Sequence, residues 1–387
     1  MSNISKKEPN LKRADFFYNL LRPIVYPPVN WWYGCKSEPL PEIDGNYLLI
    51  SNHNTNVDMI MVAASCKRPM RFVGSEHIFQ KGWAAKLLMW AVAPIIRQKG
   101  GLASSTVMSI TRALRRGENI CIFAEGNRSY DGRTCHVLPS TGKLVKAGGA
   151  ALVTYRLDRA YLTSPRWAYT LRRGGMKGKV VNVYTKEQLA AMSPEEIYEA
   201  ICRDIHEDTF EVQEKDPRPF KGKRLAEGLE HTLYYCPQCE KTGGLSTKDD
   251  KLFCSCGMQA TYNEYGLLKG TKFERTTCWN EWQKKKLGEY LDNGGSDIGD
   301  DDVSLYKITP DHRTELVYTG RVNLEKGSMN FGRYTFPLEE LDGVGLCGKA
   351  KMVLMYAGNH YELRSEKRLN ALKYVHAYEH ITGKQVI

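Results

Sequence analysis

The chain has 387 residues, of which 42% are hydrophobic and 26% are charged, and its formal net charge is +11. These proportions are ordinary for a soluble globular protein, and the length allows two or three domains. No apolar run reaches the roughly 20 residues that cross a bilayer as a helix. Lys6 and Lys7 lead into polar residues rather than into the apolar core of a signal peptide. We therefore expect a protein that stays in the cytoplasm.

The positive charge is confined to the first part of the chain. Residues 1–230 carry 34 Lys and Arg against 23 Asp and Glu, whereas residues 231–387 carry 21 of each class. A basic surface attracts nucleic acid, anionic lipid or a phosphorylated substrate, and composition does not choose among these three.

Residues 1–40 form an aromatic N-terminal segment. The part from 14 to 35 is apolar but is interrupted by an arginine and three prolines. Trp31 and Trp32 belong to a residue type that favours the interface between membrane and water. We expect this segment to associate with a membrane surface, and an arm that packs over the following domain is the alternative.

Residues 41–216 alternate between predicted strands and helices, which indicates an α/β domain with a mixed sheet flanked by helices. An apolar helix at 82–91 is either buried or faces an acyl chain or a membrane. A charged helix follows Ser193 and runs to about residue 211, before prolines end the domain. The predicted strands are 46–50, 71–74, 93–96, 119–123 and 151–156, and the helices between them are 57–64, 78–91, 104–116 and 144–147.

A polar junction joins the first predicted strand to the first predicted helix. His53 opens it, Asp58 closes it, and Thr55 or Asn56 is the expected N-cap of the helix. A carboxylate that accepts from one imidazole nitrogen leaves the other nitrogen able to take a proton from a hydroxyl. This pair is a candidate general base, and local helix capping is the alternative interpretation.

A second polar junction follows the buried strand at 119–123. Its sequence is Glu125-Gly126-Asn127-Arg128-Ser129. It combines an acceptor for a hydroxyl group with a guanidinium that suits a phosphate. Alone, this loop is more typical of a surface turn with a salt bridge.

Together the two junctions resemble the motifs of the glycerolipid acyltransferase family, in particular of 1-acylglycerol-3-phosphate acyltransferases. His53 with Asp58 is followed about 70 residues later by Glu-Gly-x-Arg-Ser, and Arg97 follows a short strand between them. The resemblance covers roughly residues 40–160. Asn127 stands where Thr is usual and Ala124 where Pro is usual. These departures alter the loop more than its charges, so the resemblance indicates the reaction class and leaves the identity of the acceptor open.

The resemblance implies transfer of a fatty acyl group from an acyl thioester to a glycerol phosphate hydroxyl. His53 would be the general base and Asp58 the residue that orients it. The donor would be acyl-CoA or an acyl carrier protein, and the acceptor lysophosphatidic acid, with glycerol-3-phosphate or another lysophospholipid as alternatives. The acceptor would be bound by Glu125, Gly126, Arg128, Ser129 and Arg97.

Four of the eleven cysteines are clustered, and they predict a zinc ribbon over residues 217–270. Cys236 and Cys239 form a C-x-x-C pair, and Cys254 and Cys256 form a second pair with one residue between them. Four thiolates suit a structural Zn²⁺ and leave no open position for catalysis. The zero net charge of residues 231–387 argues against nucleic acid as a partner.

Residues 271–302 are expected to be a linker, because their end is rich in Gly and Asp. Short alternating segments and a helix at about 367–381 then predict a small barrel over 303–387, similar in pattern to pleckstrin-homology domains. The whole chain is predicted to be a peripheral enzyme at the cytoplasmic face of the cell membrane, bound to anionic phospholipid. The alternative is a non-catalytic interaction protein that uses the ribbon and the barrel.

Overall fold

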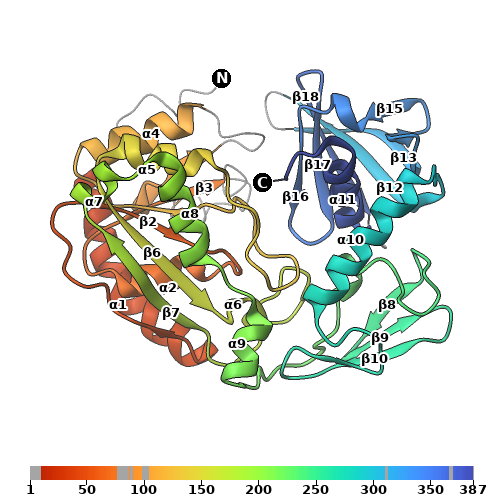
Figure 1. The fold of residues 1–387 in the computed structure, drawn as a ribbon, viewed down its shortest axis with the longest axis horizontal. Helices are drawn as coiled ribbons and strands as arrows, with labels where there is room; N and C mark the ends of the chain where they lie inside the picture. Colours follow the sequence, from red (N-terminus) through yellow and green to blue (C-terminus); the bar gives the residue numbers. More distant parts are fainter. Residues whose placement is uncertain are drawn as a thin grey trace. The chain divides into compact units, whose positions relative to one another are not determined.

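The computed structural model describes residues 10–75, 87, 90–97, 104–309, 313–365 and 369–386. It divides into two compact units, shown in Figure 1. One contains the chain up to Ser164 together with Arg172–Phe220, and the other contains Pro165–Leu171 and Lys221–Ile387. The predicted helix at 78–91 lies almost entirely outside the described residues.

The first unit is built on a seven-stranded mixed sheet, which confirms the predicted fold class. Its order is β1-β7-β6-β2-β5-β3-β4, and β2 runs parallel to both β5 and β6 while β7 is antiparallel to β6. The strands are β1 (Lys36–Ser37), β2 (Tyr47–Ser51), β3 (Arg71–Ser75), β4 (Ile95–Arg97), β5 (Ile120–Phe123), β6 (Ala151–Asp158) and β7 (Lys177–Tyr184).

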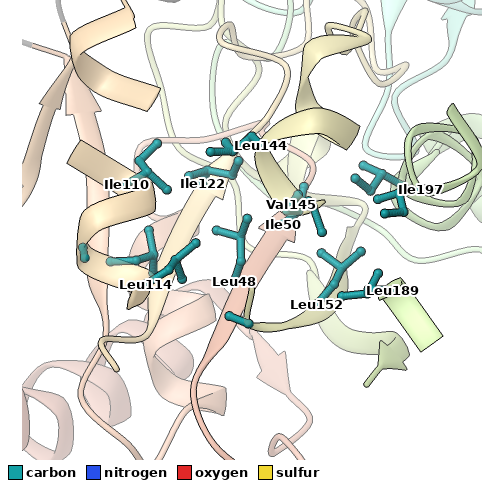
Figure 2. Packing of buried hydrophobic residues seen from close by; sticks show 14 of the residues in the cluster. Leu48, Ile50, Ile110, Leu114, Ile122, Leu144, Val145, Leu152, Leu189 and Ile197 are labelled. Atoms are coloured by element: carbon teal, nitrogen blue, oxygen red, sulfur yellow. The ribbon is translucent and has the colours of Figure 1, made fainter. Parts of the chain in front are cut away.

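Helices cover both faces of this sheet because successive strand residues point to opposite sides. Leu48 and Ile50 of β2 belong to one apolar cluster with Leu144, as Figure 2 shows. Leu49 belongs to a second cluster with Met61. The helices are α1 (Leu11–Tyr33), α2 (Asp58–Ser65), α4 (Ser104–Arg115), α5 (Ser140–Gly148), α6 (Ala160–Thr163), α7 (Lys186–Ala191), α8 (Pro194–Ile205) and α9 (Thr209–Lys215).

Two local predictions differ from the structure. The N-cap of α2 is Val57, which makes no side-chain cap bond, instead of Thr55 or Asn56. The helix expected from Ser193 to about 211 ends at Ile205, and α9 begins after Asp208, whose side chain accepts from the N–H of Phe210. Within the aromatic N-terminal segment, α1 (Leu11–Tyr33) continues through three prolines. Among the described residues, no helix is long and apolar enough to cross a membrane.

The second unit contains two antiparallel sheets. The smaller has the order β11-β10-β9-β8 and the larger the order β15-β14-β13-β12-β18-β17-β16. The first sheet comprises β8 (Leu245–Lys248), β9 (Lys251–Cys254), β10 (Gln259–Tyr262) and β11 (Leu268–Lys269). The second comprises β12 (Ile298–Ile308), β13 (Thr314–Glu325), β14 (Ser328–Phe331), β15 (Tyr334–Pro337), β16 (Gly343–Cys347), β17 (Lys351–Tyr356) and β18 (Asn359–Ser365).

The structure of this unit differs from the linker predicted over residues 271–302. Residues 271–302 contain helix α10 (Thr276–Asp292) and the first part of β12. Buried Trp279 and Leu287 explain the difference, because they give α10 an apolar side that packs into the unit. The terminal helix is α11 (Ala371–Thr382). Since β15 and β16 stand at the two ends of the larger sheet, a closed barrel of the pleckstrin-homology type stays a prediction.

The short segment Pro165–Leu171 belongs to the second unit although it lies within the sequence of the first. Trp167 is buried there, and its ring meets that of Tyr262 edge-on at 5.5 Å. The guanidinium of Arg166 donates to the carbonyl oxygens of Leu346 at 2.9 Å and Gly348 at 3.0 Å. The predicted continuous domain 41–216 is therefore interrupted by seven residues that help to build its neighbour.

Candidate active site

The two polar junctions meet because their strands are parallel neighbours. In the pairing of β2 with β5, Ser51 stands opposite Phe123. The chain then leaves both strands at the same edge of the sheet, so the loop that begins at Asn52 lies beside the loop that begins at Ala124. The N–H of Ser129 donates to the carbonyl oxygen of His53 at 2.9 Å.

His53 and Asp58 form the pair that the sequence predicts. Nδ1 of His53 lies 2.9 Å from Oδ2 of Asp58, and the Asp58 side chain is fully buried. An ionised carboxylate only accepts, so Nδ1 carries the proton of this bond. Nε2 of the neutral ring is then free of a proton and is the atom that can act as a base.

The Asp58 carboxylate also organises the loop that carries His53. Oδ2 accepts the backbone N–H of Asn54 at 2.6 Å and that of Thr55 at 2.8 Å, while the Thr55 hydroxyl donates to Oδ1 at 2.6 Å. Thr55 was expected to cap the helix, and instead it supports the carboxylate. With four donors on its two oxygens, the Asp58 side chain is held in a fixed orientation.

Phe123 supports the imidazole from the side. The two rings stack with centroids 4.3 Å apart and planes inclined by 22°. The His53 side chain keeps 24% of its surface exposed, so a substrate can reach it. Sequence reasoning missed Phe123, although its place as the last residue of β5 was a usable signal.

Glu125 holds the two loops together from inside. Oε1 accepts the N–H of His53 at 2.5 Å and Oε2 accepts the N–H of Cys135. The side chain is 1% exposed. Burial raises the pKa of Glu125 to about 8, against the lowering effect of the two N–H donors. Both oxygens of Glu125 therefore accept hydrogen bonds from backbone N–H groups. These contacts indicate that Glu125 positions the two loops.

The other predicted acceptor-binding residues have different surroundings. Gly126 adopts a left-handed backbone with φ +68°, and its N–H donates to the carbonyl oxygen of Phe123 at 3.1 Å. The Ser129 hydroxyl accepts from the N–H of Gly132 and donates to the carbonyl oxygen of Arg133. Arg128 is half-buried in the same loop. Arg97 is described only as the last residue of β4, opposite Ser75.

The four clustered cysteines converge in the second unit. Their sulfur atoms all lie within 4.8 Å of one another. Sγ of Cys236 is 3.7 Å from that of Cys256, and Sγ of Cys239 is 3.9 Å from that of Cys254. A Zn–S bond of about 2.3 Å in tetrahedral geometry places sulfurs about 3.8 Å apart. The four thiols therefore fit a zinc ion, and their separations are far from the length of a disulfide bond.

A glycine makes this convergence feasible. A Cβ on Gly244 would lie 3.0 Å from Sγ of Cys254 and 2.7 Å from Oγ of Ser255. The backbone of Gly244 also accepts the N–H of Ser255 at 3.0 Å. A side chain here would push the second cysteine pair away from the first.

Comparison with known proteins agrees with the predicted reaction class. Residues 35–157 match the family model described as Acyltransferase. No curated protein matches the chain. One similar solved structure is the 1-acyl-sn-glycerophosphate (LPA) acyltransferase PlsC from Thermotoga maritima, at 16% identity and a TM-score of 0.42, with 54% of this chain and 80% of that chain covered. The stretch that matches the acyltransferase family, residues 35–157, thus contains His53, Asp58 and the whole Glu125 loop.

Proposed function

We propose that this protein transfers a fatty acyl group from an acyl thioester to the free hydroxyl of lysophosphatidic acid. The observation that carries the proposal is the His53–Asp58 pair, held at 2.9 Å within the residues that match the acyltransferase family. The donor is acyl-CoA or an acyl carrier protein. Glycerol-3-phosphate and other lysophospholipids are the alternative acceptors.

The pair supplies base and acid in turn. Nε2 of His53 takes the proton of the acceptor hydroxyl while the oxygen attacks the thioester carbonyl carbon. A C–O bond forms, the C–S bond breaks, and the departing thiolate receives the proton from the imidazolium. Asp58 stabilises the imidazolium and keeps the ring in the required tautomer. Because the hydroxyl attacks directly, no acyl-enzyme is formed and no nucleophilic serine is needed.

The acceptor phosphate is assigned to two basic residues, Arg128 and Arg97. Arg128 is the first candidate, because the N–H of the next residue, Ser129, donates to the carbonyl oxygen of His53. A guanidinium binds phosphate with two parallel hydrogen bonds, which also fixes the direction of the substrate. Arg97 is the second candidate on the sequence resemblance alone.

A membrane surface is the proposed source of both lipid substrates. On α1, Phe16, Leu20 and Ile24 recur every four residues and therefore share one face of the helix. They are 62%, 43% and 60% exposed, and Trp31 and Trp32 near the end of α1 are 66% and 62% exposed. Such an aromatic and aliphatic face is typical of helices that lie in the membrane interface. We place the protein at the cytoplasmic face as a peripheral enzyme.

A structural Zn²⁺ is proposed for the cysteine cluster. Cys236, Cys239, Cys254 and Cys256 would hold it, and it would supply folding free energy rather than chemistry. Cys236 and Cys254 belong to the apolar core of the second unit, so the ion would cross-link that core.

The decisive experiment compares purified wild-type protein with His53→Ala on one labelled acyl thioester and a panel of acceptors. We expect the wild type to acylate lysophosphatidic acid and the variant to be slower by about 100-fold or more. Glu42→Gln, at an exposed position before β2, is the matched control. Preference for glycerol-3-phosphate would select the alternative acceptor. Equal rates for wild type and His53→Ala would overturn the mechanism, and an inert wild type would favour a binding protein.

A further inference from the structure

A second buried carboxylate contacts the loop that carries His53. It lies outside the residues that match the acyltransferase family. Glu207 stands between α8 and α9 and is 3% exposed. Its Oε2 accepts from the side-chain amide of Asn52 at 3.3 Å and from that of Asn54 at 3.2 Å. These two residues flank His53 on either side, so one carboxylate oxygen bridges the neighbours of the proposed base.

We propose that Glu207 is a positioning residue for His53, which it acts on through Asn52 and Asn54. The kinetic part of this inference rests on the proposed acyl transfer. The structural part, that Glu207 fixes the ring of His53, stands without it.

Asn52 connects Glu207 to the sheet. Its side-chain amide also donates to the carbonyl oxygen of Leu157 at 3.1 Å, and its Oδ1 accepts the N–H of Leu157 at 2.8 Å. Asn52 is 1% exposed, so these bonds are made without competition from bulk water. The residue before His53 is therefore fixed to β6 and to Glu207 together.

Asn54 connects Glu207 to the catalytic carboxylate. Its side chain donates to Glu207, and its own backbone N–H donates to Oδ2 of Asp58 at 2.6 Å. Oδ2 is the same oxygen that accepts from Nδ1 of His53. A shift of Asn54 would consequently move one of the hydrogen bonds that orient Asp58, and the imidazole with it.

Glu207 is itself held by backbone bonds. Its N–H donates to the Thr134 hydroxyl at 2.8 Å, and its carbonyl oxygen accepts the N–H of Thr134 at 2.9 Å. Its Oε1 accepts the N–H of Arg159, whose backbone is left-handed with φ +61°. Thr134 precedes Cys135, whose N–H binds Glu125. The two buried glutamates thus hold the same two loops from different sides.

A structural role alone does not account for this arrangement. Burial of a carboxylate costs free energy that an apolar side chain of similar size would avoid. The cost is offset here by N–H donors, and two of them come from the residues on either side of the base. A general base loses rate steeply when it is displaced by about 1 Å, so rigid support of these two residues has a direct benefit for catalysis.

The test compares Glu207→Gln with Glu211→Gln, a control one turn further along on the exposed side of α9. Gln keeps the size of the side chain and replaces one acceptor oxygen with a group that donates. We expect kcat of Glu207→Gln to fall about 10- to 100-fold with KM for donor and acceptor nearly unchanged. Asn54→Ala should show the same split, and the double variant should fall short of the product of the two effects.

A second readout is independent of acyl transfer. In protein labelled with ¹⁵N-histidine, the His53 ring signals are identified by their loss in His53→Ala. We expect wild type and Glu211→Gln to show the tautomer with the proton on Nδ1, and Glu207→Gln and Asn54→Ala to show shifted or broadened signals. This comparison decides the inference even if the wild type transfers no acyl group.

Two outcomes would overturn the inference. One is a folded Glu207→Gln protein with wild-type His53 signals and wild-type kcat. The other is a lower melting temperature with full activity per folded molecule, which would make Glu207 a purely structural residue. If Glu207→Gln does not fold, Asn54→Ala decides between the same outcomes, because it removes one bond to Glu207 and leaves the carboxylate in place.

Discussion

The backbone N–H of His53 donates to the carboxylate of Glu125 at 2.5 Å, across a sequence separation of 72 residues. This bond connects the residue that performs the proposed chemistry to a side chain that is 1% exposed. Glu125 therefore fixes the position of the His53 backbone, while Asp58 fixes the orientation of the His53 ring. The two acidic residues of the site have separate roles, and substitutions should separate them.

The buried carboxyl of Glu125 predicts a stability that depends on pH. Its pKa is about 8 in the folded protein against an ordinary value of 4.5, so the folded state binds more protons between these values. Stability should fall as pH rises through this window, by at most about 1.4 kcal/mol per pH unit for one group. Glu125→Gln removes this dependence and leaves one N–H facing an amide group, at a cost of about 1–3 kcal/mol.

We therefore expect Glu125→Gln to be less stable than the wild type at pH 5 and the difference to shrink toward pH 9. Urea unfolding of both proteins at several pH values measures it, and other buried groups cancel in the difference. A gap that stays constant from pH 5 to pH 9 would show that the two N–H donors keep this carboxyl ionised in the folded protein, and it would contradict the prediction.

The substitution Asp58→Asn tests whether Asp58 sets the tautomer of the His53 ring. An amide group can donate to Nδ1, which moves the ring proton to Nε2 and removes the base. We expect kcat to fall about 100- to 10,000-fold, since this is the range of a general base. Asp44→Asn, at an exposed position before β2, should leave the rate unchanged. Steady-state kinetics with circular dichroism as a check of folding measures the effect, and a folded variant with more than a tenth of the parental rate would contradict it.

Sequence patterns predict those parts of the site that depend on local spacing or on strand order. The polar junction at His53 follows from a strong apolar strand and helix, and β2 and α2 begin within one residue of the predicted positions. The meeting of the Glu125 loop with His53 follows from adjacent parallel strands. Both features need only the alternation of strand and helix along the chain.

Contacts between distant segments were not predictable in this way. Nothing near Asn54 indicates Glu207, which lies 153 residues away. The end of α8 was missed because the charged pattern continues to Glu211, although Asp208 followed by Glu211 has the spacing of a new helix start.

The exposed face of α1 predicts reversible binding to lipid vesicles. Trp31→Ser together with Trp32→Ser removes two aromatic side chains that are more than half exposed, and each buried aromatic contributes roughly 1.5–3 kcal/mol. We expect the double variant to bind vesicles of mixed neutral and anionic phospholipid at least tenfold more weakly in a sedimentation assay. Leu316→Ser, which alters an exposed residue of β13, is the control. Equal binding by all three proteins, or no binding by the wild type, would reject α1 as the membrane contact.

The sulfur geometry of the cysteine cluster predicts about one zinc ion per chain and a loss of stability when it is removed. Buried Trp279 reports on this region, because its indole N–H donates to the carbonyl oxygen of Tyr235, the neighbour of Cys236. A strong chelator should release zinc and shift the Trp fluorescence to the red, and added Zn²⁺ should reverse the change. Cys239→Ser should lower the zinc content of the purified protein, whereas Cys278→Ser, an exposed thiol outside the cluster, should not. Wild-type protein that is zinc-free by elemental analysis and insensitive to both chelator and Zn²⁺ would show that the four thiols are held together by packing alone.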